Sequence, residues 1–261
     1  MNLLKMIITD LDMTVLHTDK SISKYTQDIF KKCNENGIYT AVATARYYIG
    51  AEKYINILNP NYEITTDGTM TYKNGEFIYG TGFDIDTTDK IIQEILSIDT
   101  NLELTVATDK CIYWNSKNIA ESPVLYKVVY NDYSSPLNEC AYKVVAELPD
   151  KSIAENIGAK YDCKVISYRN ESRYGFININ AGKVQAICRL AEFLDIQMSE
   201  ITAFGDDLND VEMLMECGYG IAVENAVDEV KKTANFICES NDNDGVAKYI
   251  DKYILHDTDT L

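Results

Sequence analysis

The feature that most constrains the fold of this 261-residue sequence is an alternation of short apolar runs with amphipathic helical patterns. The apolar run Met6–Thr9 predicts a buried strand, and residues Lys24–Asn36, which are closed by Gly37, have the spacing of an amphipathic helix. The next apolar run, Ile38–Ala43, predicts a second buried strand. Two buried strands joined by a helix form a βαβ unit, so the sequence predicts a parallel sheet.

The same alternation continues through much of the chain. It predicts a helix over Ala51–Leu58, a strand over Tyr62–Thr65, a hairpin with its turn at Asn74-Gly75, a helix over Lys183–Leu194, a strand over Ile201–Phe204, a helix over Leu208–Glu216 and a strand over Gly220–Val223. All these elements fit one α/β domain.

The pattern of apolar and polar residues changes between the N-terminal and C-terminal parts of this α/β domain. From about Phe83 to Tyr174 the sequence predicts a helix over Thr88–Ile98, strands near Leu102–Ala107 and Lys143–Glu147, and it contains many tyrosines. We therefore expect a Rossmann-like, three-layer α/β core domain with a parallel sheet, formed by residues 1–82 and 180–261. An inserted α+β domain of residues 83–179 splits this core.

Composition and charge exclude several classes of protein. The formal net charge of −17 disfavours binding to nucleic acid, because that binding needs a basic face. No run reaches the roughly 18 apolar residues of a membrane-spanning helix, and no secretion signal is recognisable. Seven cysteines without a CxxC pair predict buried thiols in a reducing compartment. We expect a cytoplasmic globular protein without nucleic-acid or membrane partners, either a monomer or a homodimer.

Polar side chains follow the predicted core strands where the strands end, and open α/β sheets bind ligands beyond these carboxyl ends. These polar residues are Asp10 and Asp12, Thr44 and Arg46, Thr66 and Asp67, and Asp206, Asp207, Asn209 and Asp210. Carboxylates that meet at one sheet edge repel each other unless a cation lies between them. Oxygen ligands suit Mg²⁺ better than zinc. Neither His17 nor His256 is placed like a ligand, so acid-base work falls to a carboxylate, for which Asp12 is well situated.

Four motifs in this order resemble those of the haloacid dehalogenase superfamily of phosphohydrolases. They are "DLDMTVL" near the N-terminus, "AVATAR" with Thr44, Lys183, and "GDDLNDVEML". The stretches "TTDGTMTYKNGEFIY", "GYGIAVENA" and "ESNDNDGVAKYI" resemble its Cof-type branch. The resemblance implies that the insert is a type IIB α/β cap that decides substrate specificity. Four motifs at strand ends or helix starts are far more specific than any one of them alone.

The resemblance implies a role for each carboxylate. Asp10 is the expected nucleophile, which attacks phosphorus and forms an aspartyl phosphate. The expected ligands of Mg²⁺ are Asp10, the main-chain carbonyl of Asp12, and Asp206, with Asp210 acting through water or by orienting a ligand. Asp12 is expected to protonate the leaving oxygen and then to activate water, for which its pKa should lie well above that of Asp10.

The resemblance also implies contacts to the phosphate. Thr44 offers a hydroxyl and Lys183 a positive charge to the phosphate oxygens. The expected substrate-binding set is Thr44, Ala45, Arg46, Lys183, Asn209 and Asn225.

Several of these residues have a second interpretation. Thr44 is also ordinary at a strand end, and Asp206 or Asp210 can cap the following helix. Arg46 either steers an anionic substrate or pairs with a surface carboxylate. "NDNDG", residues 241–245, superficially resembles a calcium loop, but a polar turn before the last helix fits its spacing better.

The sequence departs from the family at three positions. Met13 and Ala45 stand where glycine is usual, and Asp67 stands where asparagine is common. A glycine after Asp12 permits unusual backbone angles, so the bulky side chain of Met13 must point away or narrow the entrance.

The expected function is Mg²⁺-dependent hydrolysis of a small phosphate ester, such as a sugar phosphate, pyridoxal phosphate or nucleotide-derived phosphate. Arg169, Arg173 and Tyr174 are candidates for substrate recognition, but the favoured interpretation is that the arginines are solvated on the surface and that tyrosines fill the core of the insert. Two alternatives stay open. One is a phosphomutase of the phosphomannomutase type, and the other is a non-catalytic metal-binding sensor, which the intact Asp10 and Asp12 disfavour.

Overall fold

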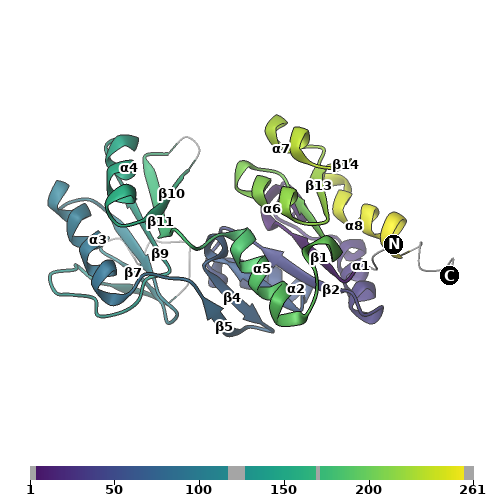
Figure 1. The fold of residues 1–261 in the computed structure, drawn as a ribbon, viewed down its shortest axis with the longest axis horizontal. Coiled ribbons are helices and arrows are strands. Elements are labelled where there is room, and N and C mark those ends of the chain that lie inside the picture. Colours follow the sequence, from purple (N-terminus) through teal and green to yellow (C-terminus); the bar gives the residue numbers. More distant parts are fainter. Residues whose placement is uncertain (1–3, 117–126, 169–170, 256–261) are drawn as a thin grey trace. The chain divides into compact units, whose positions relative to one another are not determined.

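The computed structural model describes residues 4–116, 127–168 and 171–255. The chain forms two compact units (Figure 1), which we call the core unit, residues 1–78 with 183–261, and the inserted unit, residues 79–182. The division falls a few residues from the boundaries expected from the sequence, 82/83 and 179/180.

The core unit is built on a sheet with β1 (Met6–Thr9) near its centre. In the described residues this sheet has eight strands in the order β14-β13-β12-β1-β2-β3-β4-β5. The other strands are β2 (Tyr39–Ala43), β3 (Tyr62–Thr65), β4 (Met70–Lys73), β5 (Glu76–Gly80), β12 (Ile201–Gly205), β13 (Tyr219–Val223) and β14 (Phe236–Cys238). The pairs from β14 to β3 are parallel, and β4 runs antiparallel to β3. The expected parallel sheet and the Asn74-Gly75 hairpin are confirmed.

Helices flank this sheet in two groups. One group has α1 (Lys24–Glu35) in contact with α2 (Tyr48–Leu58) and α8 (Gly245–Ile250). The other has α6 (Val211–Glu216) in contact with α5 (Lys183–Leu194) and α7 (Asp228–Thr233). Short helical segments are η1 (Leu11–Val15), η2 (Thr66–Gly68), η4 (Met198–Glu200), η5 (Leu208–Asp210), η6 (Asn241–Asn243) and η7 (Asp251–Leu255). The arrangement is the three-layer α/β fold that the sequence predicts.

Local chemistry explains where these helices begin. The Ser23 hydroxyl accepts a hydrogen bond from the backbone N–H of Thr26 at 3.0 Å and caps α1. Ile29, Phe30 and Cys33 then bury one face of α1. The predicted helix Leu208–Glu216 is instead the segment η5 followed by α6. Asp207 and Asp210 form a capping box at this point, which fixes a separate first turn.

The inserted unit has a mixed sheet and a hydrophobic core of its own. Its described residues form six strands in the order β10-β11-β9-β6-β7-β8. Its elements are α3 (Ile85–Ile98), β6 (Leu104–Ala107), β7 (Ile112–Trp114), β8 (Val128–Tyr130), β9 (Lys143–Glu147), α4 (Lys151–Lys160), β10 (Cys163–Ser167) and β11 (Arg173–Asn178). Ile91, Ile95, Val106, Val144 and Phe176 lie fully buried in this core. The inserted α+β unit is therefore confirmed as a separate packing unit.

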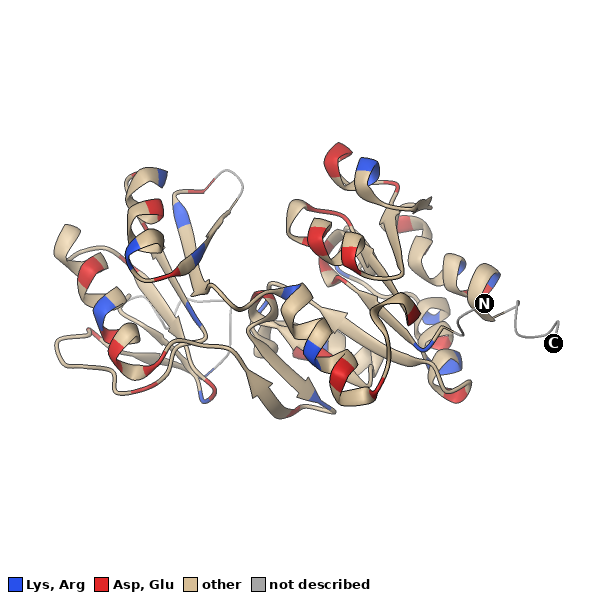
Figure 2. Ribbon diagram, in the orientation of Figure 1, with Lys and Arg blue, Asp and Glu red and all other residues tan. Residues whose placement is uncertain are grey.

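The distribution of charged residues, the character of the helices and the state of the cysteines agree with the expectations from composition. The sequence contains 41 acidic residues against 24 Lys and Arg, and Figure 2 shows acidic residues on helices of both units. None of the helices in residues 4–116, 127–168 and 171–255 has the length and apolar character needed to cross a membrane. All seven cysteines lie in the described ranges as free thiols.

Candidate active site

The loop after β1 carries the two aspartates of the first motif. The backbone N–H of Asp10 bonds to the carbonyl of Phe204 on β12 at 3.0 Å, which continues the sheet pairing as far as the site. Leu11, Val15 and Leu16 are buried and anchor the loop to the core. The Asp10 side chain is thereby held at the carboxyl edge of the sheet, where its residue is only 6% exposed.

Three carboxylates meet at this edge. One ligand atom each from Asp10, Asp206 and Asp210 lies within 4.8 Å of the others. Asp210 is fully buried and accepts hydrogen bonds from the backbone N–H groups of Asp206 at 3.0 Å and Asp207 at 3.2 Å. The hydroxyl of Thr14 donates to Asp206 at 2.6 Å. We call Asp10, Asp206 and Asp210 the acidic cluster.

A glycine makes room for the acidic cluster. A Cβ atom on Gly205, the last residue of β12, would lie 2.5 Å from the Cβ of Asp210. Any other residue would push the η5 turn, and with it Asp210, away from the sheet edge. The close approach of this turn therefore explains why a glycine precedes Asp206 and Asp207.

Lys183 is the cation that the structure places in the acidic cluster. It begins α5, is 5% exposed, and its Nζ lies 2.7 Å from Asp10 Oδ1 and 2.6 Å from Asp210 Oδ1. Burial alone would lower the pKa of Lys183, but the charges of Asp10 and Asp210 outweigh it and raise this pKa. Lys183 is thus held as a cation, and it faces carboxylates rather than solvent.

One ammonium does not balance three carboxylates. Burial raises the pKa of Asp10 well above its usual value, and repulsion from Asp210 and Asp206 adds to this against the opposing effect of Lys183. Burial and the nearby carboxylates also raise the pKa of Asp206 to about 7. The surplus negative charge and the oxygen-only donors are what a hard divalent cation requires. The acidic cluster is therefore a candidate site for a divalent metal ion.

Asp12 lies outside the acidic cluster. Its carboxylate accepts hydrogen bonds from Arg46 Nε at 2.6 Å, Arg46 Nη2 at 2.7 Å and Lys20 Nζ at 2.9 Å. Although burial opposes the change, these two cations lower the pKa of Asp12 to about 2. The expectation that the pKa of Asp12 lies well above that of Asp10 is wrong for this structure. The physical reason is the bidentate Arg46 pair, which also answers the question left open for Arg46: it pairs with a carboxylate.

The second motif follows β2, which pairs with β1 on the side away from β12. Thr44 follows β2 and is buried, and its hydroxyl oxygen accepts a hydrogen bond from the backbone N–H of Arg46 at 3.2 Å. The backbone N–H of Asp67 bonds to the carbonyl of Thr44 at 3.2 Å. The Thr44 hydroxyl can still donate its own hydrogen to an anion. Ala45 lies beside it and is half-buried.

A sequence profile described as haloacid dehalogenase-like hydrolase matches residues 7–250. The chain belongs to the haloacid dehalogenase-like hydrolases. The match includes all of the motif residues described above. Together with relatives that are named phosphatases, it identifies the chain as a phosphatase of this family.

Individual relatives agree with this assignment. The chain is 24% identical to the 5-amino-6-(5-phospho-D-ribitylamino)uracil phosphatase YitU of Bacillus subtilis over 95% of the chain and 97% of that protein. It is 26% identical to a second phosphatase of that name, YcsE of the same organism, over 97% and 96% of the two chains. The solved structure of the HAD subclass IIB sugar phosphatase BT4131 has a TM-score of 0.79 at 16% identity and covers 95% of this chain and 98% of its own. This last likeness shows the fold.

The backbone conformation bears on the departure at Met13. Met13 has φ 59° and ψ 7°, which is the left-handed region that favours glycine, the residue expected at this position from the resemblance. Asp67 is explained in the same way, because its φ is 58° and both asparagine and aspartate tolerate this conformation. Both positions therefore have left-handed backbone, with side chains other than those expected from the resemblance.

The two asparagines expected to contact substrate differ in their surroundings. Asn209 is exposed on η5, beside the acidic cluster. The side chain of Asn225 has protein partners on both sides: its Nδ2 donates to the carbonyl of Met13 at 2.7 Å, and its Oδ1 accepts from the backbone N–H of Asn241 at 2.9 Å. Sequence reasoning did not find this role of Asn225.

The remaining candidates have structural roles. Arg173 is exposed and forms an ion pair with Glu171, and Tyr174 belongs to the hydrophobic core of the inserted unit. Arg169 and His256 lie outside the described residues.

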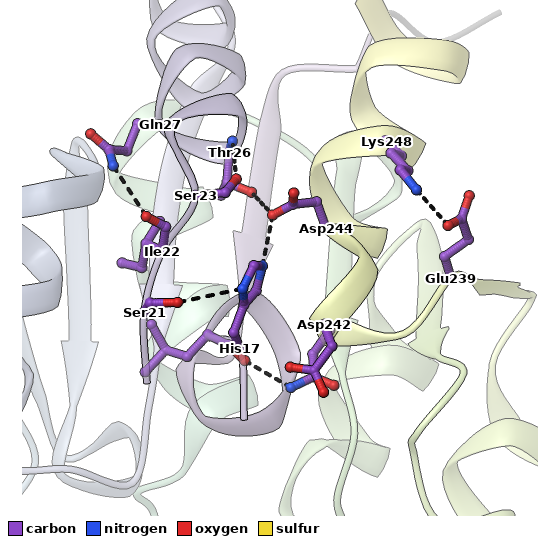
Figure 3. Close-up of polar contacts among 12 residues, drawn as sticks. His17, Ser21, Ile22, Ser23, Thr26, Gln27, Glu239, Asp242, Asp244 and Lys248 are labelled. Atoms are coloured by element: carbon purple, nitrogen blue, oxygen red, sulfur yellow. Dashed lines mark hydrogen bonds and ion pairs between the residues drawn. The ribbon is translucent and has the colours of Figure 1, made fainter. Parts of the chain in front are cut away.

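The supposed calcium loop binds protein groups instead. Asp242 accepts hydrogen bonds from Thr18, and Asp244 accepts from Thr26 and pairs with His17 (Figure 3). Across the described residues, the acidic cluster is the only group of His, Cys, Asp and Glu side chains arranged like metal ligands. The interpretation of "NDNDG" as a polar turn before the last helix fits this structure.

Proposed function

We propose that the chain is a Mg²⁺-dependent phosphatase that hydrolyses a small phosphorylated metabolite through an aspartyl phosphate on Asp10. The observation that carries the proposal is the meeting of Asp10, Asp206, Asp210 and buried Lys183 at the carboxyl edge of the core sheet. Asp10, Asp206 and the main-chain carbonyl of Asp12 would hold the metal, with Asp210 orienting the group. When bound, Mg²⁺ would neutralise charge on the transferred phosphoryl group.

The reaction divides between two aspartates. In the first step an Asp10 carboxylate oxygen forms a bond to phosphorus, the phosphorus–oxygen ester bond breaks, and the leaving oxygen takes a proton from Asp12. In the second step water attacks the phosphorus of the aspartyl phosphate, gives a proton to Asp12, and frees Asp10. Thr44 donates a hydrogen bond and Lys183 supplies positive charge to the phosphate oxygens.

Asp12 needs a change of partner to take part. With its pKa at about 2 it holds no proton near neutral pH, because Arg46 and Lys20 bind its carboxylate. Both cations are partly exposed, so an anionic substrate could compete with Asp12 for them. Their release would raise the pKa of Asp12, because burial of its carboxyl would then act unopposed, and this change is in the direction that the proton transfer of the first step needs.

The substrate class follows from the relatives. YitU and YcsE are named for a phosphorylated ribitylamino compound, and BT4131 is named a sugar phosphatase. These names support a sugar phosphate or a similar small ester as the substrate, and pyridoxal phosphate stays a further candidate from the sequence. We assign the choice of substrate to the insert, residues 83–179. The free thiols support a cytoplasmic location for the enzyme, and we expect a monomer or homodimer from the sequence.

A screen of phosphorylated metabolites at fixed Mg²⁺, scored by inorganic phosphate release, tests the proposal. We expect continuous release from one class of ester, abolished by EDTA and by Asp10→Asn. Return of the phosphoryl group to a sugar bisphosphate, with only a burst of free phosphate, would indicate a mutase. If no ester released phosphate, the alternative of a non-catalytic metal-binding sensor would be favoured.

A further inference from the structure

Hydrogen bonds connect two loops of the core unit, one of which carries the expected nucleophile. We call residues 10–18, which follow β1, the nucleophile loop, and residues 240–245, which precede α8, the polar loop. The contacts between them, direct or through Asn225, are Asn225 to Met13, Asn241 to Asn225, Asn241 to Leu16, Asp242 to Thr18 and Asp244 to His17. Figure 3 shows the last of these, the contact of Asp244 with His17, with Asp242 nearby on the polar loop. The nucleophile loop is thus held from outside along most of its length.

Asn241 is the centre of this arrangement. It is 2% exposed, its Nδ2 donates to the carbonyl of Leu16 at 3.0 Å, and its backbone N–H donates to Asn225 Oδ1 at 2.9 Å. The polar loop that presents it is tightly turned. Gly245 donates its N–H to Ser240, and a Cβ on Gly245 would lie 1.8 Å from the carbonyl oxygen of Glu239. No other residue fits at Gly245, so the turn holds Asn241 at a fixed position.

The Asn225 amide reaches the strained point of the nucleophile loop. Its Nδ2 donates to the carbonyl of Met13 at 2.7 Å, and Met13 is the non-glycine residue with φ 59°. A side chain in this conformation crowds its own backbone, so an isolated methionine would leave it. The hydrogen bond from Asn225, held in turn by Asn241, stabilises a conformation that glycine would adopt without help.

The conformation of Met13 matters because of its two neighbours. The peptide bond before Met13 contains the carbonyl of Asp12, and the peptide bond after it leads to Thr14. Thr14 donates its hydroxyl to Asp206 in the acidic cluster at 2.6 Å. A rotation at Met13 would therefore turn the Asp12 carbonyl and withdraw the Thr14 hydroxyl from Asp206 together.

We propose that Asn225 and Asn241 are positioning residues, which hold Met13 in its left-handed conformation and thereby aim the Asp12 carbonyl and Thr14 at the metal site. This proposal rests on the proposed function, because it assigns the asparagines a role in metal binding and phosphoryl transfer. It replaces the expected contact of Asn225 with substrate by a contact with the backbone that carries the reacting groups.

The test compares Asn225→Ala with the double variant Asn225→Ala/Met13→Gly. Mg²⁺ affinity is measured by titration calorimetry, and kcat and KM are measured with the ester that wild type hydrolyses best. We expect Asn225→Ala to weaken Mg²⁺ binding about tenfold and to lower kcat with little change in KM. Adding Met13→Gly should restore both the Mg²⁺ affinity and kcat, because glycine adopts the left-handed conformation without strain and does not need the Asn225 amide. Asn243→Ala, exposed in the same polar loop, is the matched control and should behave like wild type.

A merely structural role would give a different result. If Asn225→Ala lowers the melting temperature but keeps the wild-type Mg²⁺ affinity and kcat, or if Met13→Gly restores nothing, the positioning role is overturned. Asn225 is exposed, so its variant is expected to fold even where Asn241→Ala, at a buried position, does not. A wild-type protein that binds Mg²⁺ but hydrolyses no ester would overturn the proposed function alone, since the affinity comparison would still decide the positioning role.

Discussion

Replacing Lys183 by methionine should destabilise the metal-free protein strongly. Lys183 bonds to Asp10 at 2.7 Å and to Asp210 at 2.6 Å, and all three residues are at least nine-tenths buried. Removing one partner of a buried ion pair typically costs about 3–5 kcal/mol, because the other charge stays buried without compensation. Methionine keeps a similar length and helix propensity, so the loss isolates the charge. We expect Lys183→Met to lose about 3–5 kcal/mol of the free energy of unfolding at pH 8 in EDTA.

The loss should depend on pH and on metal. As the pH falls through the raised pKa of Asp10, this carboxyl takes up a proton and no longer needs the missing cation, so the difference between variant and wild type should shrink. Mg²⁺ should stabilise the variant more than wild type, because it replaces the missing positive charge.

Urea unfolding followed by far-UV circular dichroism measures the free energies. Trp114, the one tryptophan of the sequence, lies on β7 and reports the inserted unit separately by fluorescence. Lys24→Met is the control, because Lys24 is exposed and pairs with Asp28 one helical turn away, an interaction worth about 0.3–0.5 kcal/mol. A loss below about 1 kcal/mol for Lys183→Met, or an equal loss with and without Mg²⁺, would refute the argument that Lys183 compensates the acidic cluster.

Three further predictions concern single residues. Burial raises the pKa of Glu63 to about 7, so its contribution to stability is full below its unfolded pKa near 4.5 and is lost as the pH rises toward 7. Glu63→Gln should therefore remove about 2 kcal/mol of pH dependence between pH 4.5 and 7 after allowance for solvent screening, measured by urea unfolding at several pH values, with exposed Glu76→Gln as control. Met13→Gly should stabilise the protein by up to about 1 kcal/mol, because relief of about 1–2 kcal/mol of left-handed strain exceeds the entropic cost of glycine, measured by thermal unfolding. Arg46→Met should raise the pKa of Asp12 from about 2, measured by carboxyl carbon NMR titration.

Each of these predictions has a contradicting outcome. An unchanged pH profile in Glu63→Gln would show that the Glu63 carboxyl has the same pKa in the folded and the unfolded protein. A destabilised Met13→Gly variant would mean that side-chain packing, rather than backbone conformation, decides position 13. An Asp12 pKa that stays near 2 without Arg46 would assign the shift to Lys20.

Much of the core unit could be predicted from the sequence. The bounds of β1, β3 and α5 match the expected ones, because apolar runs and helical spacing define buried elements well. The short strands β7, β8 and β14, of three residues each, were missed, as were α4, α7, β10 and β11. Three residues carry too little periodicity to be recognised, and the strands of the insert depend on long-range pairing.

The sequence predicted which residues meet at the candidate site, but not how their side chains pair. Motif order and strand ends brought Asp10, Asp206, Asp210 and Lys183 together, because parallel strands end at one edge. The pairing of Asp12 with Arg46 depends on side-chain direction across two loops, which no spacing reveals. The usual glycine at position 13 was the one available signal for a left-handed backbone, and from it the need for a stabilising partner such as Asn225 could have been inferred.

The nucleophilic role of Asp10 can be tested most directly by trapping. Wild-type protein is mixed with Mg²⁺ and its best substrate, quenched with acid and treated with borohydride, which reduces an acyl phosphate to an alcohol. Peptide mass spectrometry should find homoserine at position 10, and the Asp10→Asn variant should neither be trapped nor release phosphate. Steady hydrolysis by wild type with an unmodified Asp10, or with the modification at another carboxylate, would contradict the aspartyl-phosphate mechanism.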